Sequence, residues 1–154
     1  MQTGFCYESN MGKIIIVDNG VAITCIDFGD KFEEEVEIKE SVLTKETFKQ
    51  LSEYFNGKRK EFNLPLDPVG TKFQKSVWMA LLNIPYGETR TYKEIAIKVG
   101  NEKGARAVGM ANNKNPISII IPCHRVIGSN KKLVGYAGGL HIKEKLLDLE
   151  RLNK

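Results

Sequence analysis

The first third of the chain alternates short apolar runs with turn residues, a pattern typical of β-strands. Residues 13–17 (Lys-Ile-Ile-Ile-Val) form a β-branched run, and residues 21–28 form a second apolar run. Asn19-Gly20 lies between them, and Asn-Gly is the preferred pair for a two-residue hairpin turn. A helix is predicted over residues 44–56, because apolar side chains recur there at helical spacing: Phe48, Leu51, Tyr54 and Phe55. We expect residues 1–65 to form a small domain with an antiparallel sheet.

Proline and glycine mark a boundary near the middle of the chain. Pro65, Pro68 and Gly70 follow a charged run, so residues 58–70 are the expected linker. Beyond it, helices are predicted over residues 71–84, 92–99 and 103–112, with a tight turn at 100–102. Two short helices around a glycine-containing turn indicate a helix-turn-helix. The expected fold is α+β (α/β in the broad sense): a sheet domain at 1–65, and a mostly helical domain at 70–154 with a winged-helix-like helix-turn-helix.

Composition excludes several classes of protein. Of 154 residues, 42% are hydrophobic and 27% are charged, as in a folded globular protein and unlike a disordered one. No apolar run approaches the roughly 20 residues that a membrane span needs. The N-terminus lacks the pattern of a signal peptide, and three scattered cysteines make no disulfide framework. We therefore expect a cytoplasmic protein that contacts no membrane.

Charge is divided unevenly along the chain. Residues 1–67 hold 8 Lys and Arg against 13 Asp and Glu, a net charge of −5. Residues 68–154 hold 15 against 6, a net charge of +9. A basic half of this size suggests a polyanion partner, most simply nucleic acid, although a solvated lysine-rich surface has the same composition.

The second helix of the helix-turn-helix has mainly small side chains. Gly104, Ala105, Ala107, Gly109 and Ala111 alternate with larger residues. Such a slim helix can approach another helix closely. It can also enter a DNA groove with Arg106 projecting from it, and slimness matters most in the minor groove, which is about 6 Å wide.

The most informative segment is residues 115–126, where an apolar β-branched run leads to Pro122 and Cys123. The expected strand ends at Pro122, because proline donates no ladder hydrogen bond. Cys123 then precedes His124 and Arg125, and nearby positive charge lowers the pKa of a thiol. Cys123 is therefore a candidate nucleophile, with an inert buried cysteine as the alternative.

The last predicted helix, residues 139–152, carries an acidic residue within its apolar arc. Glu150 falls between Leu146 and Leu147 at about 100° per residue. A carboxylate there is costly unless it is paired. It could accept from His124, which gives a relay Cys123–His124–Glu150, or it could pair with Lys143 along the helix.

These residues carry a resemblance to a known family. Residues 121–126 (Ile-Pro-Cys-His-Arg-Val) resemble the active-site motif of the O6-alkylguanine-DNA alkyltransferases, also called methylated-DNA–protein-cysteine methyltransferases. The similarity covers residues 70–150. Its other motifs follow in order: Phe73-Gln74, Val77-Trp78, Ile84-Pro85-Tyr86-Gly87, Thr91-Tyr92, residues 105–109, Asn115-Pro116, Gly135-Tyr136 and Gly138-Gly139.

The resemblance implies a direct, single-turnover repair reaction on double-stranded DNA. Cys123 is implied as the irreversible acceptor of the alkyl group of O6-alkylguanine, and O4-alkylthymine is a possible second substrate. His124 is implied as the base, acting through a water molecule and oriented by Glu150. Asn115 is implied to tie the helix-turn-helix to the active-site loop.

The resemblance also implies how the base is extruded and held. Arg106 replaces the flipped nucleotide, while Tyr92 pushes on the 3′ phosphate and protonates the departing guanine. The backbone carbonyls of Cys123 and Val126 accept from the guanine amino group, Tyr136 lines the pocket, and the amide of Ala137 faces O6. The implied contacts to the minor groove are completed by Lys103, Ala105, Gly109 and Arg125.

Other readings make different predictions. No cofactor is implied, and no metal is expected, because Cys6 and Cys25 lack partners for a four-ligand zinc site. A non-catalytic helix-turn-helix DNA-binding protein or regulator would keep its activity without Cys123. A papain-like cysteine hydrolase would turn over an ester or amide and would not need the basic half of the chain.

We expect the protein to be a monomer.

Overall fold

The computed structural model describes residues 2–130, 132–136 and 138–154. The chain divides into two compact units, Met1–Val69 and Gly70–Lys154. No helix among the described residues has the length and apolar character needed to cross a membrane.

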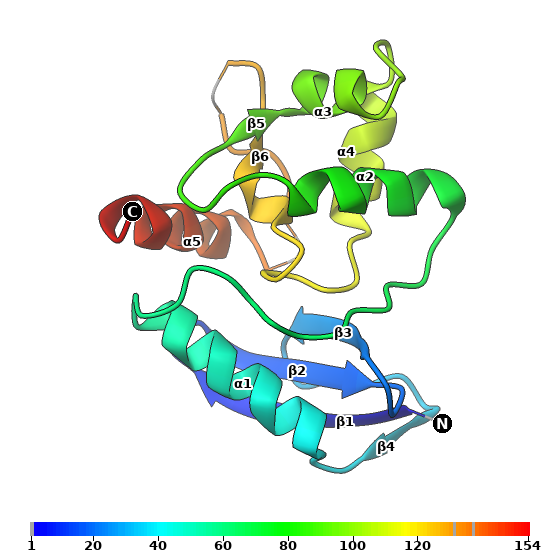
Figure 1. The fold of residues 1–154 in the computed structure, drawn as a ribbon, viewed down its shortest axis with the longest axis vertical. Coiled ribbons are helices and arrows are strands. Elements are labelled where there is room, and N and C mark those ends of the chain that lie inside the picture. Colours follow the sequence, from blue (N-terminus) through cyan, green and yellow to red (C-terminus); the bar gives the residue numbers. More distant parts are fainter. Residues whose placement is uncertain (1, 131, 137) are drawn as a thin grey trace. The chain divides into compact units, whose positions relative to one another are not determined.

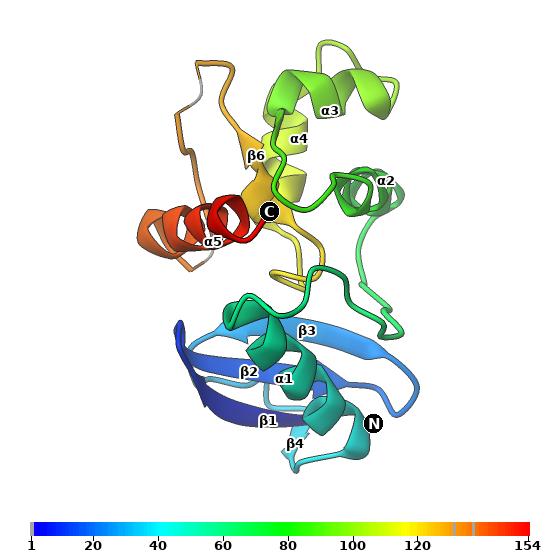
Figure 2. The same cartoon turned by 60° about the vertical axis from the view of Figure 1, so that its left-hand side comes forward.

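The first unit is a four-stranded sheet with one helix across it (Figures 1 and 2). Its elements are β1 (Gln2–Ser9), β2 (Gly12–Asp18), β3 (Ile23–Phe28), β4 (Val36–Ile38) and α1 (Val42–Phe55), with strand order β3-β2-β1-β4. The pairs β1–β2 and β2–β3 are antiparallel, as expected, but β4 runs parallel to β1. The sheet is therefore mixed, because residues 29–35 carry the chain from the β3 edge to the opposite edge.

Local sequence explains the turn and the helix start in this unit. Asn19 Oδ1 accepts from the amides of Val21 and Ala22 at 3.0 and 2.9 Å, so the turn is longer than two residues and β3 begins only at Ile23. Ser41 caps α1 in a reciprocal box with Thr44, which satisfies two amides that a helix start leaves unpaired. The core contains Ile14, Ile16, Ile26, Leu51 and Tyr54, each at most 1% exposed.

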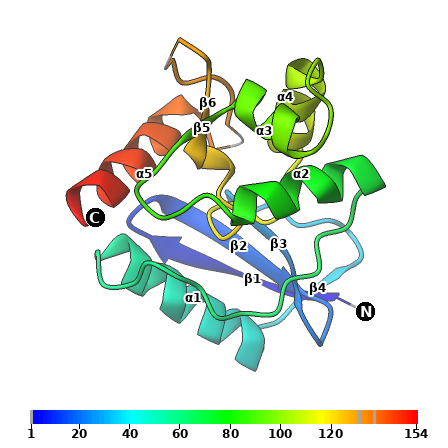
Figure 3. The same ribbon diagram turned by 45° about the horizontal axis from the view of Figure 1, so that its top comes forward.

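The second unit is mostly helical (Figure 3). Its elements are α2 (Lys72–Leu82), β5 (Arg90–Thr91), α3 (Tyr92–Lys98), α4 (Ala105–Asn113), the 3-10 turn η1 (Cys123–Arg125), β6 (Val126–Ile127) and α5 (Leu140–Leu152). β5 and β6 form a two-residue parallel ladder. The indole of Trp78 on α2 donates to the carbonyl of Ala111 on α4 at 2.9 Å, which fixes the helix-turn-helix against α2.

The helices α3 and α4 form the expected helix-turn-helix. Thr91 caps α3 in a box with Glu94. Gly100 then has a φ of 80°, a left-handed conformation that glycine adopts without steric cost and that ends the helix. Ile95, Ala96 and Val108 are at most 3% exposed and form the core between the two helices.

Candidate active site

Cys123 begins a 3-10 turn rather than following a strand. The run 117–121 folds into tight turns: the amide of Ile121 donates to the carbonyl of Ile117 at 3.1 Å, and Ile119 has a φ of 76°. The prediction of a strand here is therefore wrong, because the backbone hydrogen bonds of this run join residues close in sequence and form no ladder with another strand. The amide of Cys123 donates to the carbonyl of Ile121 at 2.7 Å, and the residue is 4% exposed.

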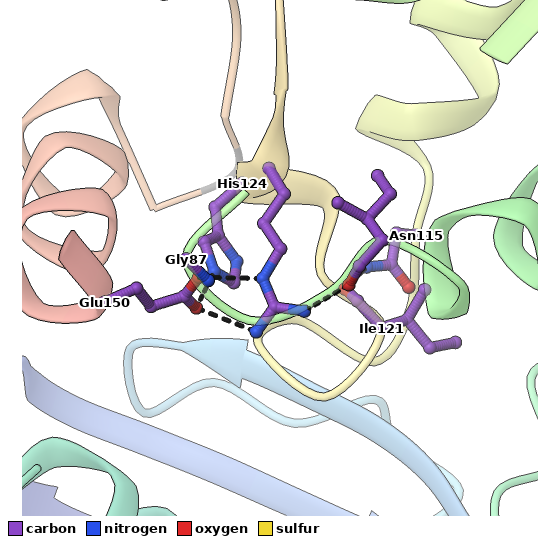
Figure 4. A network of polar contacts seen from close by, with 7 residues as sticks. Gly87, Asn115, Ile121, His124 and Glu150 are labelled. Atoms are coloured by element: carbon purple, nitrogen blue, oxygen red, sulfur yellow. Dashed lines mark hydrogen bonds and ion pairs between the residues drawn. The ribbon is translucent and has the colours of Figure 1, made fainter. Parts of the chain in front are cut away.

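His124 and Glu150 form a buried pair. Nε2 of His124 lies 2.6 Å from Oε2 of Glu150, and both residues are at most 1% exposed (Figure 4). Burial lowers the pKa of His124, although the contact with Glu150 opposes this. Burial alone would raise the pKa of Glu150, but hydrogen bonds and charge from His124 and Arg125 outweigh it and bring that pKa to about 2. A neutral imidazole that donates from Nε2 to a carboxylate results.

The other ring nitrogen of His124 is free to act as a base. Nδ1 is buried and has no hydrogen-bond partner among the described residues. In a neutral imidazole that donates from Nε2, Nδ1 carries a lone pair and accepts a proton. The predicted contact between His124 and Glu150 is thus present in the structure.

Arg125 is part of this buried network. Its Nε and Nη2 donate to the two oxygens of Glu150 at 2.8 and 3.0 Å, and Nη1 donates to the carbonyl of Ile84 at 2.7 Å. The amide of Gly87 adds a bond of 3.2 Å to Glu150. Because Arg125 is 7% exposed and its donors are engaged, the expected DNA contact of Arg125 does not fit this structure. The turn at residues 84–87 instead supplies backbone groups that hold the network.

Lys143 is not the partner of Glu150. Its ammonium group is fully buried and donates to the carbonyls of Val126, Val134 and Gly135 at 2.7, 3.0 and 3.4 Å. Burial lowers the pKa of Lys143 to about 8. The lysine thereby links β6 to the segment that leads to Tyr136.

The surroundings of Cys123 favour the protonated thiol. Burial raises its pKa to about 11, while a hydrogen bond from Asn115, the charge of Lys143 and backbone amides of the turn act in the opposite direction. The two neighbours expected to supply positive charge do not, since His124 is neutral and Arg125 is paired. The remote Lys143 is the cation that acts on the thiol, and sequence spacing gave no signal for it.

Two asparagines connect the helix-turn-helix to the turn that carries the thiol. Asn115 Nδ2 donates to the carbonyl of Ile121 at 2.8 Å, and its Oδ1 accepts from the amide of Ile117 at 3.0 Å (Figure 4). Asn112, on α4, donates to the carbonyl of Cys123 at 3.3 Å. Asn112 was missed by sequence reasoning, and its place on the buried side of the helix would have been the signal.

The predicted pocket residues lie around the same turn. Tyr92 donates from Oη to the carbonyl of Val134 at 2.9 Å. The pKa of Tyr92 is raised, mainly by burial and to a smaller extent by its interaction with Cys123. The carbonyl of Cys123 already accepts from Asn112 and from the amide of Val126, which uses both lone pairs. The carbonyl of Val126 accepts from Lys143. Tyr136 is half-buried, and Ala137 lies outside the described residues.

The predicted DNA contacts lie on and before α4. Arg106 and Lys103 are exposed, whereas Ala105 and Gly109 are half-buried. A Cβ added at Gly109 would lie 3.8 Å from two ring carbons of Tyr92, so the pocket tyrosine stands directly beside this helix. Among the described residues, no group of three or more His, Cys, Asp or Glu side chains is placed to hold a metal ion.

Fold and site together define a DNA-binding helix-turn-helix unit with a buried cysteine beside a His–Glu pair. Residues 72–152 match the family model of the 6-O-methylguanine DNA methyltransferase DNA-binding domain, and residues 5–68 match that of its ribonuclease-like domain. The chain belongs to the 6-O-methylguanine DNA methyltransferase family, which confirms the resemblance seen in the sequence.

Similar proteins cover nearly the whole chain. It is 54% identical over 151 residues to the methylated-DNA–protein-cysteine methyltransferase of Methanosarcina barkeri, with 95% of each chain covered. It is 47% identical over 154 residues to the constitutive methyltransferase of Bacillus subtilis, with 95% and 93% covered. The crystal structure of Mycobacterium tuberculosis OGT in complex with DNA is 42% identical, with a TM-score of 0.93 over 98% of this chain and 94% of that one.

Proposed function

We propose that this protein repairs DNA by transferring the alkyl group of O6-alkylguanine to its own Cys123. The observation that carries the proposal is the buried His124–Glu150 pair, next in sequence to the buried Cys123, with Nδ1 of the imidazole available as a proton acceptor. A thiol is a weak nucleophile at its ordinary pKa and is activated by an adjacent base. Family membership supports the same reaction.

Besides water, the transfer needs only groups of the protein and the DNA. Sγ of Cys123 attacks the alkyl carbon, the C–O6 bond breaks, and its electron pair stays on guanine. The thiol proton passes through a water molecule to Nδ1 of His124. The departing guanine takes a proton from Oη of Tyr92, which is protonated at neutral pH. Exchange with solvent then removes the proton from His124 and returns one to Tyr92. Because the thioether is stable, each protein molecule reacts once and no cofactor is consumed.

Extrusion of the damaged nucleotide is assigned to the helix-turn-helix. A base inside a duplex cannot reach a thiol that is 4% exposed, so the nucleotide must leave the stack. The exposed Arg106 projects from a helix of small residues and is proposed to fill the gap. Lys103, Ala105 and Gly109 are proposed to contact the backbone of the minor groove, while Val126, Tyr136 and Ala137 are proposed to receive the base.

The proposed setting is the cytoplasm, where the protein acts as a monomer. Its three cysteines are free thiols, which suits a reducing compartment.

A single-turnover repair assay tests the function. A duplex with one O6-methylguanine is mixed with substoichiometric protein, and the restored guanine is counted. The proposal predicts a burst equal to the amount of protein and then no further repair, with Cys25→Ala behaving like the unaltered protein and Cys123→Ala inactive. Continued turnover, or repair by Cys123→Ala, would contradict it.

A further inference from the structure

Helix α4 has one exposed face, and three side chains at helical spacing form it. Arg106, Met110 and Asn113 are exposed, whereas Val108 and Ala111 are buried. Residues three and four positions apart lie on the same side of a helix. Met110 is 65% exposed and is the long apolar side chain of this face.

This face borders the region of the reactive thiol. The ring of Tyr92 stands beside Gly109, the residue before Met110, since a Cβ added at this glycine would lie only 3.8 Å from the ring. At the end of the helix, a Cβ on Gly135 would come within 3.0 Å of Oδ1 of Asn113. The exposed face therefore runs from Arg106 to the segment that carries Tyr136, one of the residues proposed to receive the base.

We propose that Met110 packs against the sugar walls of the minor groove, next to the base pair that Arg106 opens, and adds an uncharged, sequence-independent part to duplex binding. This rests on the proposed function. Proteins that bind the minor groove commonly place apolar side chains at base steps. Four residues along a helix span about 6 Å, or nearly two base-pair steps, so Met110 meets the duplex beside the gap and not inside it.

The chemistry of methionine suits a protein that must examine any sequence. The side chain is unbranched and its thioether is polarisable, so it adapts to grooves of differing width. It makes no hydrogen bond that would select a base edge. A lysine at this position would instead add another phosphate contact, with the salt dependence that such contacts bring.

Exposure alone does not distinguish Met110, because single exposed apolar residues are ordinary on protein surfaces. Met79 on α2 is 64% exposed and provides the comparison. The two methionines differ in position: Met110 lies between Arg106 and Asn113 on the exposed face of α4, and Met79 lies on another helix. Met79 is therefore a matched control for every measurement.

The first test measures duplex binding and repair by Met110→Ala and Met79→Ala. We expect Met110→Ala to weaken the Kd for an undamaged duplex roughly fivefold, with an unchanged slope of log K against log salt. Repair of a duplex should slow, whereas reaction with free O6-benzylguanine should not. Met79→Ala should match the unaltered protein. Equal affinity of Met110→Ala and the unaltered protein, or a reduced salt slope, would overturn the inference.

The second test needs no substitution. Hydrogen peroxide oxidises exposed methionines, and a bound duplex should protect Met110 but leave Met79 reactive. Oxidation of Met110 at the same rate with and without DNA would overturn the inference even if repair itself is confirmed. Failure of the unaltered protein to take up a methyl group would instead overturn the proposed function.

Discussion

Oε2 of Glu150 lies 2.6 Å from Nε2 of His124 although 26 residues separate them, and this contact sets which ring nitrogen can act as a base. The carboxylate also binds Arg125 through both of its oxygens, so its position is determined from two sides. The orientation of the imidazole thus depends on α5. This helix supplies only two residues to the proposed chemistry, Glu150 and Lys143.

Replacing Glu150 by Gln should slow methyl transfer more than it weakens DNA binding. The amide cannot stabilise a protonated His124, so the rate should fall about 10²- to 10⁴-fold, the usual contribution of acid–base catalysis. The variant should also lose about 3 kcal/mol of stability, because Arg125 stays buried without its counter-ion. Single-turnover kinetics and urea unfolding measure the two effects. Glu144→Gln, on the exposed side of α5, is the control, and equal rates for both variants would remove Glu150 from the relay.

Arg106 and Arg125 should differ in how they affect the salt dependence of DNA binding. Arg106 is exposed, and filling the gap would bring its positive charge between the phosphates of the duplex, so Arg106→Ala should reduce the salt slope by about 0.9. Arg125 is held by Glu150 and Ile84, so Arg125→Met should leave the slope unchanged and lower the melting temperature instead. Fluorescence anisotropy at several salt concentrations measures both slopes. A reduced slope for Arg125→Met would restore the DNA contact first expected for it.

Lys143→Met should impair both stability and reactivity. The substitution removes the donor to the carbonyls of Val126, Val134 and Gly135, and it removes the cation that opposes the high pKa of the Cys123 thiol. A loss of about 1 to 3 kcal/mol of stability is expected, since the buried carbonyl of Val126 then loses its charged donor. Thiol titration should show a further rise in the pKa of Cys123. Lys145→Met, two residues along the same helix and exposed, should change neither property.

The positions of some elements follow from short-range patterns, and others do not. Helix α1, the β2–β3 pair and the helix-turn-helix were predicted, because apolar periodicity and turn residues act over a few positions. Glu150 was singled out because a carboxylate inside an apolar arc requires a partner. Strand β1 gave no such signal, since its sequence from Gln2 to Ser9 mixes polar and apolar residues without a clear period.

Long-range contacts account for what sequence reasoning missed. The run Ile117–Ile121 has the composition of a buried strand, but its backbone pairs with itself and with Asn115. Arg125 adjoins His124 in sequence, yet its partners lie 25 and 41 residues away. Lys143 lies on the same side of the helix as Glu150, but its carbonyl partners come from residues 126, 134 and 135, which positions along the helix cannot reveal.

Acid should destabilise the protein through Glu150. Its folded pKa, about 2, lies below its ordinary value of 4.5. The unfolded chain therefore binds the proton first as pH falls, and stability present above pH 4.5 is lost progressively toward pH 2. The free energy of unfolding should fall by about 3 kcal/mol over this pH range. Urea unfolding at stepped pH measures it, and Glu150→Gln should lack this part of the decline. An identical pH profile for the variant would contradict the low pKa.

The central claim is that Cys123, among the three cysteines of the chain, is the alkyl acceptor. Intact-protein and peptide masses after reaction with a duplex that holds one O6-methylguanine test it most directly. The account predicts a gain of one methylene unit per protein, confined to the peptide with Cys123, and no gain on the peptides with Cys6 or Cys25. A protein that binds the duplex and stays unmodified, or that gains the methyl group at another residue, would contradict it.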